Sequence, residues 1–329
     1  MSALSVFWFC LAPVLLTLYC ATDGFDLGVA TIYGFIRNPE DKKTALYSIW
    51  PVWNGNEVWL IGSIGVLIAA FPPVYGTLLS AMYVPVYLTL FSIILRGVSI
   101  EYFPKVKSPG LRKFLAALFT AGSAFILFAI GFVGSNVLNG LPVDSLGIMQ
   151  KGFLSLFHPF SITAGIASII FFSDYGALYL LVKTPGWGYM KKVFNMSWIF
   201  SFTLLLLSFL CGMFLIPGAS SIMKAKPVIP AVLIISALFY ITAYLSARRS
   251  SYGLSFIFYS LTIAGIISSC AGVMFPNLLL SSLSRDFSMT VLNSSSSDKS
   301  LLTSLIILLA GLPFIAWFII WIYRVFRKI

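Results

Sequence analysis

The sequence predicts an all-α polytopic membrane protein with nine transmembrane helices, and three observations support this fold class. Hydrophobic residues make up 59% of the 329 residues and charged residues only 9%, whereas a soluble globular protein carries about 25% charged residues. The apolar residues fall into runs of roughly 20, a length that crosses about 30 Å of hydrocarbon as a helix. In lipid every backbone N–H and C=O group must find its partner within the protein, so these runs are helices.

The apolar segments alternate with short polar loops, and no loop is long enough to form a soluble domain. We therefore expect one membrane domain over residues 1–329, built as two four-helix bundles plus one extra helix, with a boundary between the halves near residues 138–156. A faint sequence echo favours two halves, because Thr22-Asp23-Gly24 closes the first span and Ser173-Asp174-Tyr175-Gly176 closes the fifth. Residues 71–76 are expected to form a very short hairpin turn. The expected spans cover residues 4–34, 48–72, 77–100, 114–137, 157–182, 194–216, 228–247, 253–275 and 301–325.

Lysine and arginine residues concentrate after the odd-numbered spans. Sixteen of the 21 basic residues follow spans 1, 3, 5, 7 and 9, and five lie on the other side. Because cytoplasmic loops carry the excess of basic residues, the N-terminus is expected outside and the C-terminus in the cytoplasm. The net charge of +11 has this origin, and we expect no nucleic-acid partner. The sixteen residues are Arg37, Lys42, Lys43, Arg96, Lys105, Lys107, Arg112, Lys113, Lys183, Lys191, Lys192, Arg248, Arg249, Arg324, Arg327 and Lys328.

The N-terminal apolar segment resembles a signal peptide in length only. Residues 1–19 contain no Lys or Arg, so the basic region of a signal peptide is missing. The segment also continues into a polar motif without a small-residue cleavage pattern. We expect it to be an uncleaved first span.

The composition excludes several kinds of site. His158 is the only histidine, so the chain cannot hold a haem between two histidines or build a multi-histidine metal site. It precedes a proline at the start of a span, where a surface role is expected. The four cysteines lie in apolar runs without a CxxC pair, which is typical of small buried residues. We therefore expect no cofactor and no metal bound by this chain.

The most informative residues are ionisable groups in or at the ends of the first three spans. An ionisable group at the bilayer centre costs at least about 2.5–3.5 kcal/mol, so it usually faces protein or water and has a role. Asp23 and Asp26 are three residues apart and share a helix face. Two such carboxylates repel unless a cation lies nearby or one is protonated. Arg96, at the end of the third span near Glu101, is the candidate partner, although a solvated helix end and a snorkelling arginine remain alternatives.

The second span opens on an unusually polar stretch. Asn54 and Glu57 are three residues apart and are expected to share a helix face. A stretch this polar needs partners on a neighbouring helix. Trp53 and Trp59 bracket it, and an interfacial aromatic belt is the alternative explanation for both tryptophans.

Four stretches in the first hundred residues resemble the signature stretches of the cytochrome bd oxidase subunit II family in order and spacing. Later stretches, such as HPFSITAGIASI at 158–169 and MFPNLLLSS at 274–282, agree more loosely, so the resemblance covers nearly the whole chain. The four are TDGFDLGV at 22–29, WNGNEVWL at 53–60, AAFPPVY at 69–75 and LRGVSIEY at 95–102.

This resemblance implies a nine-span subunit of a quinol oxidase in the bacterial cytoplasmic (inner) membrane, inactive alone. The complex oxidises quinol, reduces oxygen to water and builds a proton gradient with protons taken from the cytoplasm. Subunit I, the expected partner, carries haems b and d and the quinol-oxidising loop. Subunit II is expected to stabilise the complex and to line routes for protons or oxygen. A small accessory subunit and bound lipid or quinone are further candidate partners.

The resemblance breaks at one position that matters for the proton route. Family members usually carry Asp where this chain has Asn54, and that Asp is the acid proposed for the proton route in subunit II. Because asparagine does not titrate, the role does not transfer to Asn54, and Glu57 on the same face is the candidate substitute. Trp59 matches a family position near the proposed oxygen path.

We therefore expect a cytoplasm-facing polar cluster of Asp23, Asp26, Glu57, Arg96 and Glu101, with Asn54 beside it. Two other interpretations remain at this stage. A secondary ion-coupled transporter could use the same acids, although transporters often show broken helices at the midplane and clear repeats. The cluster could also lock helices together without moving protons.

Overall fold

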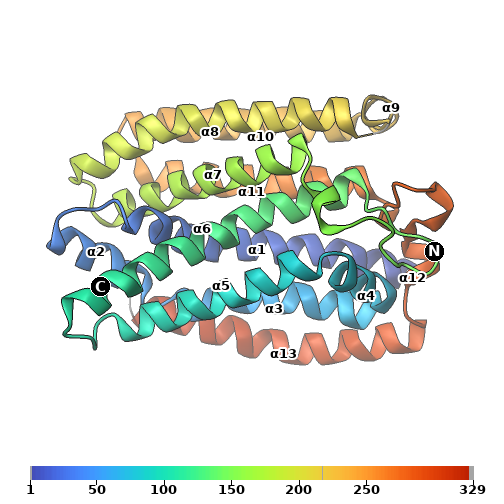
Figure 1. Cartoon of the computed structure of the whole chain (residues 1–329), viewed down its shortest axis with the longest axis horizontal. Helices are drawn as coiled ribbons and strands as arrows, with labels where there is room; N and C mark the ends of the chain where they lie inside the picture. The colour runs from blue at the N-terminus through green and yellow to red at the C-terminus, as the bar shows by residue number, and fades with distance from the viewer. Residues whose placement is uncertain (1, 217, 326–329) are drawn as a thin grey trace.

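The computed structural model describes residues 2–216 and 218–325, which form long helices lying side by side along one axis (Figure 1). Within this part of the chain, eight helices are long and apolar enough to cross a membrane. A ninth crossing is reached if the bent pair α3 (Trp53–Ala70) and α4 (Pro72–Ala81) counts as one. The prediction of an all-α polytopic protein is confirmed. The eight are α1 (Ala3–Tyr33), α5 (Tyr83–Tyr102), α6 (Pro109–Asn139), α7 (Pro159–Lys183), α8 (Gly188–Leu215), α10 (Val228–Arg248), α11 (Tyr252–Met274) and α13 (Asp298–Val325), of which residues 298–318 meet the criterion.

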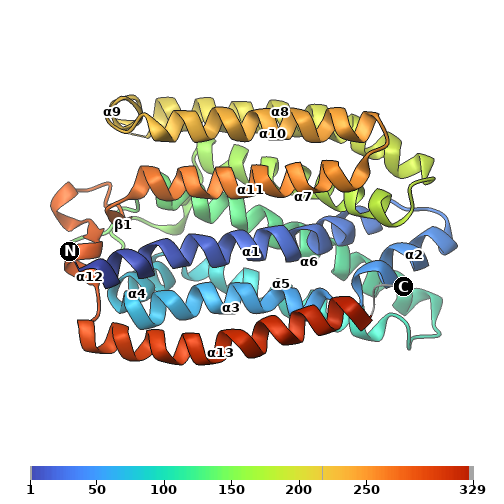
Figure 2. The same ribbon diagram turned by 180° about the vertical axis from the view of Figure 1, so that it is seen from behind.

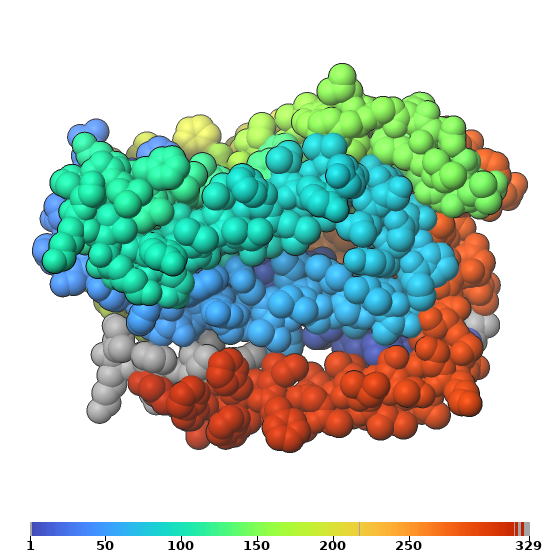
Figure 3. Space-filling view, turned by 60° about the horizontal axis from the view of Figure 1, so that its bottom comes forward, coloured from blue at the N-terminus to red at the C-terminus, as the bar shows by residue number. Residues whose placement is uncertain are grey.

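Helix α1 lies at the centre of the bundle. It packs against α3 and α6 on one side and against α7 and α11 on the other. Its last third, from Asp23 to Tyr33, is buried throughout. Helix α13, by contrast, lies at the edge and contacts mainly α3 and α1. A space-filling view shows α13 standing apart from its neighbours over part of its length (Figure 3).

Helices α1 and α13 run in the same direction, so the start of α1 and the end of α13 lie at opposite ends of the bundle (Figure 2). This arrangement fits an odd number of crossings. The short helix α2 (Pro39–Ile49) lies at the end where α1 finishes, and α9 (Ala219–Ala225) lies at the other end. The orientation relative to the membrane stays a prediction.

The connection between the second and third spans differs from the predicted short turn. Residues 72–81 form a separate helix, α4, bent by 119° from α3. The break falls at Phe71, whose backbone leaves the helical region (φ −137°, ψ 59°), and the two prolines that follow occupy the first turn of α4. Proline is tolerated there because the first helical N–H groups have no intrahelical acceptor. The expected third span therefore begins later, with α5 at Tyr83.

Other boundaries also shifted. The second span was expected from residue 48, but residues 39–49 form α2, which Asn38 caps by accepting a hydrogen bond from the Glu40 N–H. Helix α8 begins at Gly188 rather than 194. The serine-rich loop expected between 276 and 300 contains a small antiparallel pair, β1 (Asn277–Leu279) with β2 (Met289–Thr290), and the short helix α12 (Val291–Ser294). These polar segments lack the apolar periodicity on which the span limits depended.

Two glycines let α1 and α7 cross in direct backbone contact. A Cβ atom on Gly28 would overlap the carbonyl of Phe172, and one on Gly176 would overlap the backbone of Val29 and Gly28. Small residues permit this approach, which gives membrane helices van der Waals contact where lipid supplies no hydrophobic drive. The contact joins the helices of the first four spans to those of the next four.

Replacing Gly176 by alanine should weaken this crossing. The added methyl group meets backbone that cannot rotate away, and overpacking of this kind costs typically about 1–3 kcal/mol. Thermal unfolding of the purified protein in detergent measures the effect. Gly134→Ala on α6 is the matched control, because a Cβ atom there meets nothing within 4 Å. Equal melting temperatures for the two variants would contradict the close crossing.

The orientation can be tested with single cysteines at exposed positions at the two ends. Ser108 precedes α6 at the basic end, and Ser145 lies in the loop that follows α6. In intact cells, a membrane-impermeant maleimide should label Ser145→Cys and leave Ser108→Cys unlabelled until the cells are opened. The unsubstituted chain gives the background of its four native cysteines. The reverse labelling pattern would overturn the predicted orientation.

Candidate functional site

The first three spans converge on one buried arginine. Arg96 on α5 donates from Nη2 to Asp23 Oδ1 at 2.7 Å and from Nη1 to Asp23 Oδ2 at 3.0 Å. The same Nη1 donates to Glu57 Oε1 at 2.9 Å. The pairing with Asp23 is therefore bidentate, the strongest geometry available to an arginine and a carboxylate. One guanidinium thus joins α1, α3 and α5.

A second acid of α1 lies beside this pair. Asp26 Oδ2 accepts a hydrogen bond of 2.7 Å from Asn56 Nδ2, and the same amide donates to the Thr22 carbonyl at 3.2 Å. Asp26 Oδ1 is buried and finds no hydrogen-bond partner among the described residues. We call Asp23, Asp26, Asn56, Glu57 and Arg96 the Arg96 cluster.

The Arg96 cluster combines deep burial with an excess of acids. The side chains of Asp23 and Arg96 are 0% exposed and that of Glu57 is 19% exposed. Trp53 covers the guanidinium, with its ring centroid 5.7 Å from the Arg96 Cζ atom. Three carboxyl groups face one guanidinium, so neutrality requires a proton on two of them. Because an unpaired buried charge is costly, this arrangement favours bound protons that can exchange.

The structure brings together four of the six residues expected in the polar cluster. Asn54 instead lies in the first turn of α3 with its side chain exposed, so it does not share the buried face of Glu57. Glu101 is half-buried near the end of α5, and no ion pair to it occurs among the described residues. Trp59 is partly buried against the hydrophobic core, and its place near an oxygen path stays a prediction.

Arg96 differs from the snorkelling arginine considered above. Its side chain is fully buried inside the bundle, so it does not reach the cytoplasmic surface or count as a loop base. Without Arg96 in the count, basic residues still concentrate after the odd-numbered spans. Trp53 is likewise buried and covers Arg96, which a belt of interfacial tryptophans would not do.

The sequence argument missed Asn56, although it lies in the quoted stretch WNGNEVWL. It is 1% exposed and supplies the amide that orients Asp26. The available signal was an amide next to Glu57 at the start of an apolar span. A buried amide beside an acid in an apolar span requires a partner, because an unpaired one costs about 1–3 kcal/mol.

His158 has a structural contact at the start of α7. It is the N-cap of α7, where its Nδ1 accepts a hydrogen bond from the Ser161 N–H at 3.2 Å. Its Nε2 lies 3.5 Å from the Asn139 side-chain amide. Because Nδ1 acts as an acceptor, a neutral ring carries its proton on Nε2. Within the described part of the chain, no group of three or more His, Cys, Asp or Glu residues could hold a metal ion.

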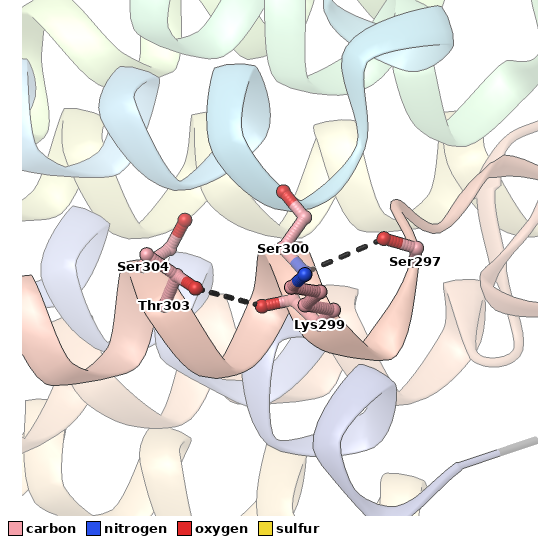
Figure 4. Close-up of a pocket in the computed structure, with 5 residues that line it drawn as sticks. All are labelled: Ser297, Lys299, Ser300, Thr303 and Ser304. Atoms are coloured by element: carbon pink, nitrogen blue, oxygen red, sulfur yellow. Dashed lines mark hydrogen bonds between the residues drawn. The ribbon is translucent and has the colours of Figure 1, made fainter.

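A pocket lies at the start of α13, away from the Arg96 cluster (Figure 4). Two of its polar contacts are internal to the helix start: the Ser300 N–H donates to Ser297 Oγ at 3.3 Å, and the Thr303 hydroxyl donates to the Lys299 carbonyl at 2.9 Å. These contacts stabilise the first turns of α13, and they do not mark a binding site. It is lined by Ser297, Lys299, Ser300, Thr303 and Ser304.

The chain resembles known proteins over nearly its whole length. The chain is 29% identical to the cytochrome bd-I ubiquinol oxidase subunit 2 of Escherichia coli (strain K12), over 98% of this chain and 94% of that protein. It is 28% identical to the cytochrome bd ubiquinol oxidase subunit 2 of Bacillus subtilis (strain 168), over 100% and 97% of the two chains. A chain of the solved bd oxidase of Geobacillus thermodenitrificans shares the fold, with a TM-score of 0.81 and 16% identity over 99% of each chain. The family model described as cytochrome bd terminal oxidase subunit II matches residues 4–326, so the chain belongs to this family.

Proposed function

We propose that this chain is a haem-free subunit II of a cytochrome bd-type quinol:oxygen oxidoreductase, and that its Arg96 cluster binds and releases protons taken up from the cytoplasm. The observation that carries the proton role is the buried surplus of carboxyl groups around one guanidinium. A cluster that served only as an ion pair would need one acid. Family membership supports the first part, because the family comprises subunits of an oxidoreductase complex.

The haems and the quinol belong, in this proposal, to subunit I. Haems b and d need axial ligands, and the only histidine of this chain caps α7 through its Nδ1. The two curated relatives are named ubiquinol oxidase subunits, which supports a quinol as the substrate of the complex. This chain then stabilises subunit I in the membrane and contributes no redox centre.

The proposed location is the bacterial cytoplasmic membrane, since the relatives come from bacteria and the chain has eight or nine candidate spans. Many of the exposed large side chains on the helices are apolar, as contact with lipid or with a membrane partner requires. Subunit I is the first such partner. A small accessory subunit, lipid or quinone could cover further parts of this surface.

Glu57 is the proposed entry point of the Arg96 cluster. It is partly exposed, whereas Asp23 and Asp26 are completely buried, so Glu57 is the acid of the cluster that reaches the surface of the chain. It shares Arg96 with Asp23 and can therefore pass a change of protonation to that pair. Asn54, which replaces the acid usual in the family, is exposed and does not titrate.

Replacing Glu57 by glutamine should slow quinol-driven proton uptake by the purified two-subunit complex by about tenfold or more, equivalent to at least about 1.4 kcal/mol on the rate-limiting barrier. The amide keeps the size of the side chain but cannot carry the proton. Haem content, read from the absorption spectrum, should not change. Glu40→Gln on α2, an exposed acid outside the cluster, is the matched control. Normal proton uptake by a normally assembled Glu57→Gln complex would contradict the proposed role of Glu57 in proton uptake.

Replacing Arg96 by glutamine separates a structural lock from a proton site. Removing one partner of a buried pair costs about 3–5 kcal/mol because the other charge is left behind. The variant should therefore give little assembled complex, measured as haem-containing oxidase per milligram of membrane. Adding Asp23→Asn removes the stranded charge and should restore assembly.

The restored double variant then decides the mechanism. With assembly regained, slow proton uptake would support the proton role of the Arg96 cluster. Full turnover of the assembled double variant would instead mean that the cluster only holds α1, α3 and α5 together.

A further inference from the structure

A second buried acid lies in the other half of the bundle. Asp174 on α7 is 0% exposed. The Tyr240 hydroxyl on α10 donates to its Oδ2 at 3.4 Å, and also donates to Ser201 Oγ on α8 at 2.9 Å. Ser201 is therefore linked to this carboxyl group through the Tyr240 hydroxyl, and the Ser197 hydroxyl lies nearby. Asp174 Oδ1 is buried and has no hydrogen-bond partner in the described part of the chain.

No cation among the described residues forms an ion pair with this acid. The described residues form two ion pairs, and both belong to Arg96. The titratable groups beside Asp174 are the phenols of Tyr240 and of Tyr259 on α11, and α8 contributes only hydroxyls. Helices α1 and α6, which also pack on α7, place no described lysine, arginine or acid in an ion pair with it. A bare carboxylate here would cost several kcal/mol without compensation.

The position of Asp174 resembles that of Asp26. Each aspartate stands two residues before a glycine of the crossing between α1 and α7, Gly28 and Gly176 respectively. Near Asp26, Arg96 pairs with the neighbouring acids Asp23 and Glu57. In the second half neutral serine and tyrosine side chains surround the acid instead. The crossing thus carries a buried aspartate on each helix, Asp26 next to the Arg96 cluster and Asp174 among hydroxyl groups.

We propose that Asp174, with Ser197, Ser201 and Tyr240, is a second proton-binding site, separate from the Arg96 cluster. Its ligand is H⁺, which adds to the carboxylate and leaves a neutral carboxylic acid. The bound proton fits the surroundings because a protonated acid is a donor, and hydroxyl oxygens of serine are the acceptors nearby. The site goes beyond the proposed function, since it requires neither Glu57 nor Arg96.

Ser197 gives the site its access. It is partly exposed, whereas Ser201 and Tyr240 are buried. It also lies one turn closer than Ser201 to the start of α8, where Lys191 and Lys192 lie. A proton from that end therefore meets Ser197 before it reaches Asp174.

Infrared spectroscopy of the purified two-subunit complex tests the site without relying on turnover. At neutral pH the complex should show a carbonyl stretching band of a protonated carboxylic acid that shifts in D₂O and is lost in Asp174→Asn. Tyr240→Phe, which keeps the acid and removes its hydroxyl donor, should shift the same band. A spectrum unchanged by both substitutions would overturn the proposal. So would an ionised-carboxylate band at Asp174 that responds to Na⁺ or K⁺, because it would mean a metal-cation site.

Exchange kinetics test the access route. Ser197→Ala should slow the shift of the Asp174 band after transfer to D₂O several-fold. Ser208→Ala is the matched control, because Ser208 is a buried serine further along α8. Equal exchange in the two variants would refute access through Ser197. The proton role of the Arg96 cluster could fail on its own tests while these bands still appear, so the two outcomes are distinguishable.

Discussion

The architecture of the first half depends on one buried guanidinium. Arg96 is 0% exposed and holds acids from α1 and α3 from its place on α5. In a bundle surrounded by lipid, apolar contact alone gives helices little reason to choose one neighbour over another. A buried charge must find its partners, so the three helices fit together in the register that lets Asp23 and Glu57 reach the same arginine. In the proposed function, the surplus acids around this fixed arginine supply the exchangeable protons.

The crossing of α1 and α7 complements this interaction. Gly28 and Gly176 bring the two backbones into contact, and each lies two residues beyond a buried aspartate. Packing and polar chemistry are therefore coupled, because the close approach carries Asp26 and Asp174 into the interior together. The two acids differ in what the neighbouring helices supply. Arginine stands beside the first pair of acids, and serine and tyrosine surround the other acid.

Sequence reasoning predicted the parts of this structure that rest on strong physical constraints. The span count and the pairing of Arg96 with the acid of the first span follow from the cost of exposing polar groups to lipid, which acts at every position. Limits such as the start of α8 were missed because polar residues can extend a helix beyond the hydrocarbon. Helix α4 was missed because its prolines indicate a break but not the helix that follows it. The exposure of Asn54 and the contact of Asn56 with Asp26 depend on the rotation of α3, which tertiary packing decides.

The proposal that the Arg96 cluster binds exchangeable protons can be tested most directly by infrared difference spectroscopy of the complex, before and after quinol is added. A proton-exchanging cluster predicts a carboxyl band that changes in amplitude during turnover, shifts in D₂O and disappears when Glu57 is replaced by glutamine. A carboxyl spectrum that stays constant during turnover, in a complex that still consumes oxygen, would contradict it.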